Sequence, residues 1–187
     1  SGQTLEDSGF TSLTDLQYVV PGVQYDPTQG AAFQIRGVGS TSFDFSNAKS
    51  VNVVVDDVVM DAQRDNGLIG LTDIQRVDVL MGPQGTLFGR NTEGGALSMV
   101  TKAPTGEFGA RMTAGLGNYG SRNADIHLDL PAFFNIALKF DGVYQHQDPT
   151  VKDPLAGSVG WNYYDRKGGR AAARWTPFDG LTADFSY

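Results

Sequence analysis

The second half of the chain alternates apolar and polar residues with a period of two, and this pattern most limits its possible folds. Successive side chains of a β-strand point to opposite faces of a sheet, so strict alternation predicts strands. Five segments after Gly106 follow the rule. Their apolar positions are Phe108, Ala110, Met112, Ala114 and Leu116; Ala124, Ile126, Leu128 and Leu130; Phe134, Ile136, Leu138, Phe140 and Tyr144; Ala171, Ala173 and Trp175; and Leu181, Ala183, Phe185 and Tyr187.

The opposite positions of these segments are charged nearly throughout, and two kinds of sheet fit such a pattern. One is a half-buried antiparallel sheet of a soluble sandwich, and the other is the wall of a membrane barrel. Charged side chains facing lipid near the bilayer midplane would each cost about 2–4 kcal/mol, so in a barrel they would have to line the lumen. The cations concerned are Arg111, Lys139, Arg170 and Arg174.

The connections between the expected strands favour the barrel. Short turns are expected at Pro131 and Ala132 and at residues 176–180, whereas residues 146–165 read as a long polar loop. Outer-membrane barrels alternate short periplasmic turns with longer extracellular loops. Residues 117–120 are an exception, because this connection is short although it occupies the position of an outer loop. The alternation alone leaves both kinds of sheet open.

Composition excludes several other classes. The chain has 187 residues, 24 Gly, no Cys and a formal net charge of −7. It is therefore neither a disulfide scaffold nor a typical nucleic-acid binder, which would carry a basic surface. No apolar run approaches the roughly 20 residues that a membrane-spanning helix needs. Ser1 begins without the charged and apolar regions of a signal peptide, so the chain is expected to be mature or soluble.

The first half of the chain has a mixed pattern that predicts a small domain with its own core. A short helix is expected over residues 13–19, capped by Ser12 or Thr14 and ended by Pro21 and Gly22, because Pro cannot continue the helical hydrogen bonds. Strands are expected over residues 33–37, 51–55, 76–81 and 96–101.

A corner rich in glycine joins the last two of these strands. Gly82, Pro83 and Gly85 end the first strand, since Pro lacks an amide donor and Gly permits positive φ. Leu87 and Phe88 are expected to pack inward. A pair of glycines, residues 94–95, would allow close backbone approach where the next strand begins. A phosphate-binding loop is rejected, because Arg90 and Asn91 stand where Gly-Lys-Ser/Thr would be needed.

Residues 73–102 read D-I-Q-R-V-D-V-L-M-G-P-Q-G-T-L-F-G-R-N-T-E-G-G-A-L-S-M-V-T-K, which resembles the signature of the plug domain of TonB-dependent outer-membrane receptors. Residues 16–23, the triplet Ile35-Arg36-Gly37 and residues 53–58 are similar to further motifs of that family. Three positions depart from its pattern. Asp78 stands for the usual Glu, Met81 for Arg before Gly-Pro, and Asp57 for Gly after Asp.

The resemblance implies an α+β plug domain over residues 1–105, a small mixed sheet with short helices. Residues 106–187 would then be about the first five antiparallel strands of a transmembrane β-barrel. Plugged outer-membrane transporters close with roughly 22 strands, so the chain is expected to be the N-terminal part of a larger receptor. The energy-coupling box of the family would lie before Ser1. A soluble β-rich module that binds carbohydrate or peptide is the alternative.

The function implied by the family is active import of a scarce nutrient across the outer membrane of a Gram-negative bacterium, with the plug gating the barrel. A ferric siderophore is the expected ligand on frequency alone, since the family also carries haem, cobalamin and some saccharides. The implied partners are outer-membrane lipid, the small-molecule ligand and an inner-membrane complex that acts through TonB. No nucleic-acid partner, cofactor, metal site or catalytic residue is expected, because His127 and His146 fit no metal or triad spacing.

Two loops are the expected ligand-binding apices of the plug. Residues 36–47 offer Arg36, Ser40, Phe43 and Phe45, and residues 60–66 offer Asp61, Gln63 and Arg64. A structural ion pair of Arg36 and packing of the two phenylalanines into the plug core are open alternatives. A lock between plug and barrel wall is assigned to Arg36, Arg76, Asp78 and Arg90, with Arg76 or Arg90 compensating for the missing arginine at Met81.

Overall fold

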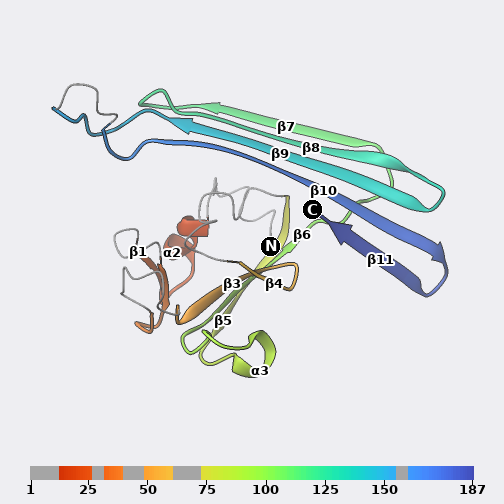
Figure 1. Ribbon diagram of the computed structural model, residues 1–187, viewed down its shortest axis with the longest axis horizontal. Coiled ribbons are helices and arrows are strands. Elements are labelled where there is room, and N and C mark those ends of the chain that lie inside the picture. Colours follow the sequence, from red (N-terminus) through yellow and green to blue (C-terminus); the bar gives the residue numbers. More distant parts are fainter. Residues whose placement is uncertain (1–12, 27–31, 40–48, 61–72, 155–159) are drawn as a thin grey trace. The chain divides into compact units, whose positions relative to one another are not determined.

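The computed structural model describes residues 13–26, 32–39, 49–60, 73–154 and 160–187. The chain divides into two compact units, Ser1–Lys102 and Ala103–Tyr187 (Figure 1). Within the described ranges no helix is long and apolar enough to cross a membrane.

The first unit combines short helices with two small sheets. The β4-β3-β6-β5 sheet has parallel strands only between β3 and β6, and β1 pairs with β2 in an antiparallel hairpin. The elements are η1 (Leu13–Asp15), α2 (Leu16–Val19), β1 (Val23–Asp26), β2 (Ala32–Ile35), β3 (Val51–Val55), β4 (Val58–Met60), β5 (Ile74–Met81), α3 (Gly85–Phe88) and β6 (Gly95–Thr101).

The four strands expected in this half are present, and two short strands were missed. β1 directly follows the turn at Gly22, where φ is +84°, and β4 follows the two-residue turn of Asp56 and Asp57, which have φ of +46° and +66°. Two positive φ values are the geometry of a tight hairpin that matches the twist of its strands. The expected helix is divided into η1 and α2, and its N-cap residue Asp15 makes no side-chain capping hydrogen bond.

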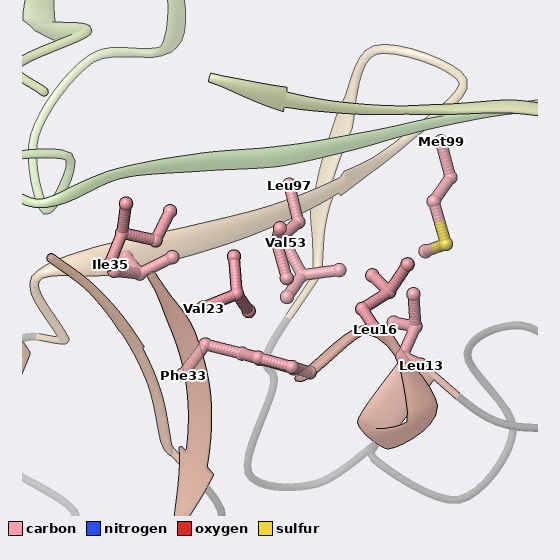
Figure 2. Packing of buried hydrophobic residues seen from close by; sticks show 9 residues of the cluster. Leu13, Leu16, Val23, Phe33, Ile35, Val53, Leu97 and Met99 are labelled. Carbon is pink, nitrogen blue, oxygen red and sulfur yellow. The ribbon is translucent and has the colours of Figure 1, made fainter. Parts of the chain in front are cut away.

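The core of the first unit lies between the helices, the β1–β2 hairpin and one face of the larger sheet. Val53 and Leu97, which are Cα partners on the parallel strands β3 and β6, are both fully buried. Figure 2 shows side chains of η1, α2, β1 and β2 gathered around them. The cluster consists of Leu13, Leu16, Val23, Phe33, Ile35, Val51, Val53, Leu97 and Met99. Local elements too short to be stable alone are thus held by shared apolar burial.

The glycine-rich corner contains a one-turn helix, α3, and the expectation that Leu87 packs inward is wrong. Leu87 is 71% exposed, whereas Phe88 is half-buried. Backbone hydrogen bonds hold the corner instead. The amides of Leu87 and Phe88 donate to the carbonyl of Gln84 at 3.1 and 2.9 Å, and the Gln84 amide donates to Thr92 at 3.0 Å. The corner therefore needs little side-chain burial to keep its shape.

The second unit is a five-stranded antiparallel sheet in sequence order, drawn in Figure 1 from green to dark blue. Its number of strands agrees with the alternation of the sequence. The strands are β7 (Gly109–Leu116), β8 (Arg122–Phe133), β9 (Ile136–Gln147), β10 (Tyr164–Phe178) and β11 (Leu181–Ser186).

Two of the expected turns are corrected. Pro131 and Ala132 lie inside β8, where the register shifts between Leu130 and Phe133, and the turn to β9 consists of Phe134 and Asn135 with φ of +49° and +61°. Proline is tolerated in a strand at such an irregularity, because one ladder hydrogen bond is already missing there. The β10–β11 turn is also tighter than expected, because β10 continues to Phe178.

Gly95 allows a close approach that no other residue would permit, as the sequence suggested for this glycine pair. A Cβ atom at Gly95 would collide with the Leu80 carbonyl oxygen and lie 2.8 Å from Ile35 Cδ1, and φ there is +142°. We expect Gly95→Ala to destabilise the β5–β6 pairing by about 1–3 kcal/mol. Amide hydrogen exchange of these strands measures the loss.

Gly85→Ala is the matched control for this substitution. Gly85 lies in α3 with nothing within 4 Å of an added Cβ and without positive φ. Alanine there should leave exchange of β5 and β6 unchanged or slow it slightly, since Ala favours helix over Gly by about 1 kcal/mol. Equal exchange in both variants would contradict the close approach.

Candidate functional site

Of the residues expected at the plug apices, the structure describes Arg36. It follows β2 in the left-handed region, with φ of +53°, and its side chain is exposed. The Arg36 amide donates to the Gly22 carbonyl at 2.7 Å, which ties the start of this loop to the turn before β1. The remaining expected ligand residues lie outside the described residues; they are Ser40, Phe43, Phe45, Asp61, Gln63 and Arg64.

The residues expected to lock plug to barrel occupy three places. Arg76 and Asp78 lie on one face of β5, and Arg76 Nε donates to Asp78 Oδ2 at 2.9 Å. Arg90 lies in the turn after α3, where its carbonyl accepts a hydrogen bond from Asn52 Nδ2 at 3.0 Å. The structure therefore brings Arg76 and Asp78 together, whereas Arg36 and Arg90 lie in separate turns. A lock to the barrel wall stays a prediction.

Two carboxylates that the sequence did not single out hold the end of the first unit. Asp56 accepts hydrogen bonds from the Thr101 amide at 2.9 Å and from Thr101 Oγ1 at 2.6 Å. Lys102 Nζ lies 2.8 Å from Asp73 Oδ1, and the Lys102 amide donates to the Asp73 carbonyl at 2.7 Å. The last residues before the sheet of the second unit are thus fixed to the turn after β3 and to the start of β5.

The faces of the β7–β11 sheet have burial opposite to that of a soluble sheet. On β9, Lys139 is 1% exposed and Asp141 6%, whereas Phe140 between them is 45% exposed. Met112 on β7 is 71% exposed. A soluble protein would bury the apolar side chains and leave the charged ones in water. The apolar face of this sheet instead suits contact with lipid, as in the wall of a membrane barrel.

Charged residues of the polar face are paired across neighbouring strands. Arg111, His127, Asp141 and Arg170 form one row through the registers of β7 to β10. His127 Nδ1 lies 2.8 Å from Asp141 Oδ1, and Arg170 Nη1 lies 3.5 Å from Asp141 Oδ2. Opposite charges within this range stabilise one another where water is scarce. His127 is thus part of a row of polar contacts across the strands.

Two further pairs extend this arrangement over the face. Lys139 Nζ lies 3.9 Å from Asp129 Oδ2. Arg174 binds Asp184 through two hydrogen bonds, of 2.7 Å from Nε and 2.9 Å from Nη2. Such a fork-to-carboxylate pair fixes geometry as well as charge. The cations expected on the polar face therefore lie there, and Lys139, Arg170 and Arg174 each face a carboxylate.

The sequence profile of the family described as TonB-dependent Receptor Plug Domain matches residues 1–96, just over half of the chain. The chain belongs to the TonB-dependent receptors. These are outer-membrane proteins of Gram-negative bacteria. This localisation agrees with a sheet whose apolar face is exposed and whose charged face is buried. Receptors of this family are not enzymes.

Similar proteins include receptors of two enteric bacteria. The pesticin receptor of Yersinia pestis is 33% identical over 134 residues, which are 70% of this chain and 19% of that protein. The catecholate siderophore receptor Fiu of Escherichia coli is 29% identical over 131 residues, 69% of this chain and 16% of that protein. The chain spans less than a fifth of the length of either relative.

The crystal structure of FyuA, the ferric yersiniabactin uptake receptor of Yersinia pestis, matches the whole chain. The TM-score is 0.84 at 28% identity, with 30% of that receptor covered. The plug and the antiparallel strands of this chain therefore have the fold of the corresponding part of a plugged receptor.

The contacts of Asp56 can be tested against its neighbour in the same turn. Asp56 and Asp57 both have positive φ, so glycine would relieve backbone strain at either position. Asp56→Gly also removes both hydrogen bonds to Thr101. We expect Asp56→Gly to raise amide exchange of Thr101 in the full-length receptor, at a cost of about 1–3 kcal/mol. Asp57→Gly should leave this amide unchanged; equal effects would contradict the proposed fixation.

The orientation of the sheet can be tested on β7. Met112 lies on the apolar face and Thr113 on the polar face. Met112→Arg should cost about 2–4 kcal/mol near the bilayer midplane and reduce the amount of folded receptor in the outer membrane. Thr113→Arg should assemble normally, because its register partner on β8 is Asp125. Heat-modifiable gel mobility of the full receptor gives the folded fraction, and normal assembly of both variants would contradict the lipid-facing assignment.

Proposed function

We propose that this chain is the plug and the leading barrel strands of a transporter that takes up a ferric siderophore across the outer membrane with energy supplied through TonB. The proposal rests on two features found in one chain. One is a plug domain, and the other is a sheet whose charged face is buried and whose apolar face is exposed. The likeness to a ferric yersiniabactin uptake receptor supports the ligand class.

Each of the two units would have its own role in the proposed transporter. Residues 1–105 would be the plug, and residues 106–187 would be the first strands of a barrel of roughly 22 strands. The outer edges of β7 and β11 would have to be paired by further strands, since lipid offers no hydrogen bonds to a free sheet edge. The apolar face would contact lipid, and the polar face would line the lumen.

Ligand would bind at the plug apices, and an inner-membrane complex would act on the plug through TonB. The proposed apex residues are Arg36, Ser40, Phe43, Phe45, Asp61, Gln63 and Arg64. Arg36 is exposed beside the loop that it begins, which agrees with a role in contacting ligand. The proposed contacts of Arg36, Arg76, Asp78 and Arg90 with the barrel wall would hold the plug in place until it is pulled.

Uptake by the full-length receptor tests the proposal. A Gram-negative host that lacks its own siderophore receptors would express the receptor and receive radioiron bound to yersiniabactin or to a catecholate siderophore. We expect iron to accumulate with at least one of the two complexes and the accumulation to disappear when the tonB gene is deleted. Cyanocobalamin serves as the control ligand. Accumulation that persists without TonB, or uptake of cobalamin alone, would overturn the proposal.

A further inference from the structure

We propose that Arg166, supported by Tyr164 and flanked by the amides of Asn123 and Gln145, binds an anionic oxygen of the ligand at one end of the polar face. This inference rests on the proposed function and names a contact on the strands rather than on the plug. The oxygen would belong to a carboxylate, phenolate or hydroxamate, the groups with which siderophores hold iron.

The registers of four strands place these residues on one row. Gly115, Asn123, Gln145 and Arg166 are successive Cα partners on β7, β8, β9 and β10. Each lies four residues along its strand from the row of Arg111, His127, Asp141 and Arg170, so both rows share the polar face. Gly115 leaves room for the Asn123 amide, which would have to turn aside if a Cβ were added there.

The row of Arg166 lies at the end of the sheet where ligand would arrive. β9 and β10 are joined at this end by residues 148–163, the longest connection of the second unit. The tight turns at Phe134 and Asn135 and at Gly180 lie at the opposite end. Long loops of outer-membrane barrels are extracellular and short turns are periplasmic. The row would therefore face the outer mouth of the lumen.

Arg166 differs from Lys139, Arg170 and Arg174 of the same face in lacking a carboxylate partner. Lys139, Arg170 and Arg174 each lie within 4.0 Å of an aspartate oxygen. Among the described residues, no carboxylate oxygen lies that close to the Arg166 guanidinium. Its charge is left for an anion that is not part of the described chain, whereas Arg170 in the neighbouring row has Asp141 beside it.

The Arg166 side chain is also held in position. Its guanidinium carbon lies 4.7 Å from the centroid of the Tyr164 ring, within the range of a cation–π contact. Tyr164 is fixed in turn, because its hydroxyl donates to Gln147 Oε1 at 3.3 Å. Gln147 Nε2 donates to the Asn162 carbonyl at 3.0 Å. A planar guanidinium that is fixed before the ligand binds loses less conformational entropy on binding. Its two parallel N–H groups suit bidentate contact with oxygen atoms.

The neighbouring amides add selectivity for the same kind of ligand. Asn123 and Gln145 are half-buried and carry both donors and acceptors, so they can bind further oxygens without adding charge. The anion site would therefore take a partly neutralised iron complex with several exposed oxygens better than a bare inorganic anion.

Lys167 provides a matched control on the same strand. Its ammonium nitrogen lies 5.4 Å from the Tyr144 ring centroid, so it too is a cation over a tyrosine. Lys167 and Tyr144 are Cα partners on the apolar face, opposite to Arg166. The two residues have the same charge and the same kind of aromatic support. They differ in the face to which they belong and in their carboxylate neighbours, because Lys167 Nζ lies 3.9 Å from Asp165 Oδ1.

The test measures binding of ferric yersiniabactin and of a ferric catecholate to the full-length receptor in detergent. For a complex that the wild-type receptor binds, Arg166→Ala should weaken binding by about 10- to 100-fold, the loss expected for one charge-assisted hydrogen-bonding group. Arg166→Lys should lie between this variant and the wild type, because it keeps the charge and loses the fork. Lys167→Ala should bind within about twofold of the wild type.

The outcomes separate this inference from the proposed function. Wild-type affinity of Arg166→Ala, or an equal loss in Lys167→Ala, overturns the anion site and leaves siderophore uptake standing. Failure of the wild-type receptor to bind either complex overturns the proposed function and the anion site with it. Heat-modifiable mobility of each variant shows that the barrel is assembled, and Arg166→Lys supplies the comparison if the alanine variant is not.

Discussion

The pairing of charges across the polar face of the β7–β11 sheet is the interaction on which the rest of the second unit depends. With its apolar face in lipid, the sheet must carry its charged residues on the other side, at positions where Lys139 and Asp141 are almost inaccessible to water. Isolated ions at such positions would be costly, and only partners close in space offset that cost. Asp141 has His127 and Arg170 as partners on the two neighbouring strands, and Lys139 has Asp129. The strand register therefore brings opposite charges together, and the pairing of these charges in turn favours that register.

The plug is stabilised by different means. Its core is small and apolar, centred on the parallel strands β3 and β6, and most of its helices and strands are too short to persist alone. Polar contacts add order at its end, where Asp56 and Asp73 bind the backbone and side chains of Thr101 and Lys102. A domain built from short segments opens in parts more readily than one with a large core. Such a construction agrees with the proposal that the plug is displaced while the strands of the second unit stay paired.

The sequence allowed some of this structure to be predicted, and the reasons for success and failure are physical. Alternation gave the five strands and their faces, because a period of two is imposed by strand geometry whatever the neighbours are. A turn was wrongly expected at Pro131, because proline is tolerated at a bulge within a strand as well as in a turn. Leu87 was expected inside because it is apolar, yet hydrogen bonds alone hold its corner. The contacts of Asp56 with Thr101 depend on the parallel pairing of β3 with β6, which no local pattern encodes.

In the proposed uptake function, ligand choice would depend on few residues of this chain. Most charges of the polar face are used in holding the sheet together, so a change of ligand can leave them untouched. The residues free to vary are those at the apices and at the end of the sheet near residues 148–163. There the Arg166 guanidinium lies over the Tyr164 ring, and no carboxylate oxygen of the described residues is close to it. The chain shares the fold of FyuA at a TM-score of 0.84 with 28% identity, so much of its sequence can differ while the fold is kept. Changes at the apices and beside Arg166 would leave the paired charges of the sheet intact, so specificity could change there without loss of the wall.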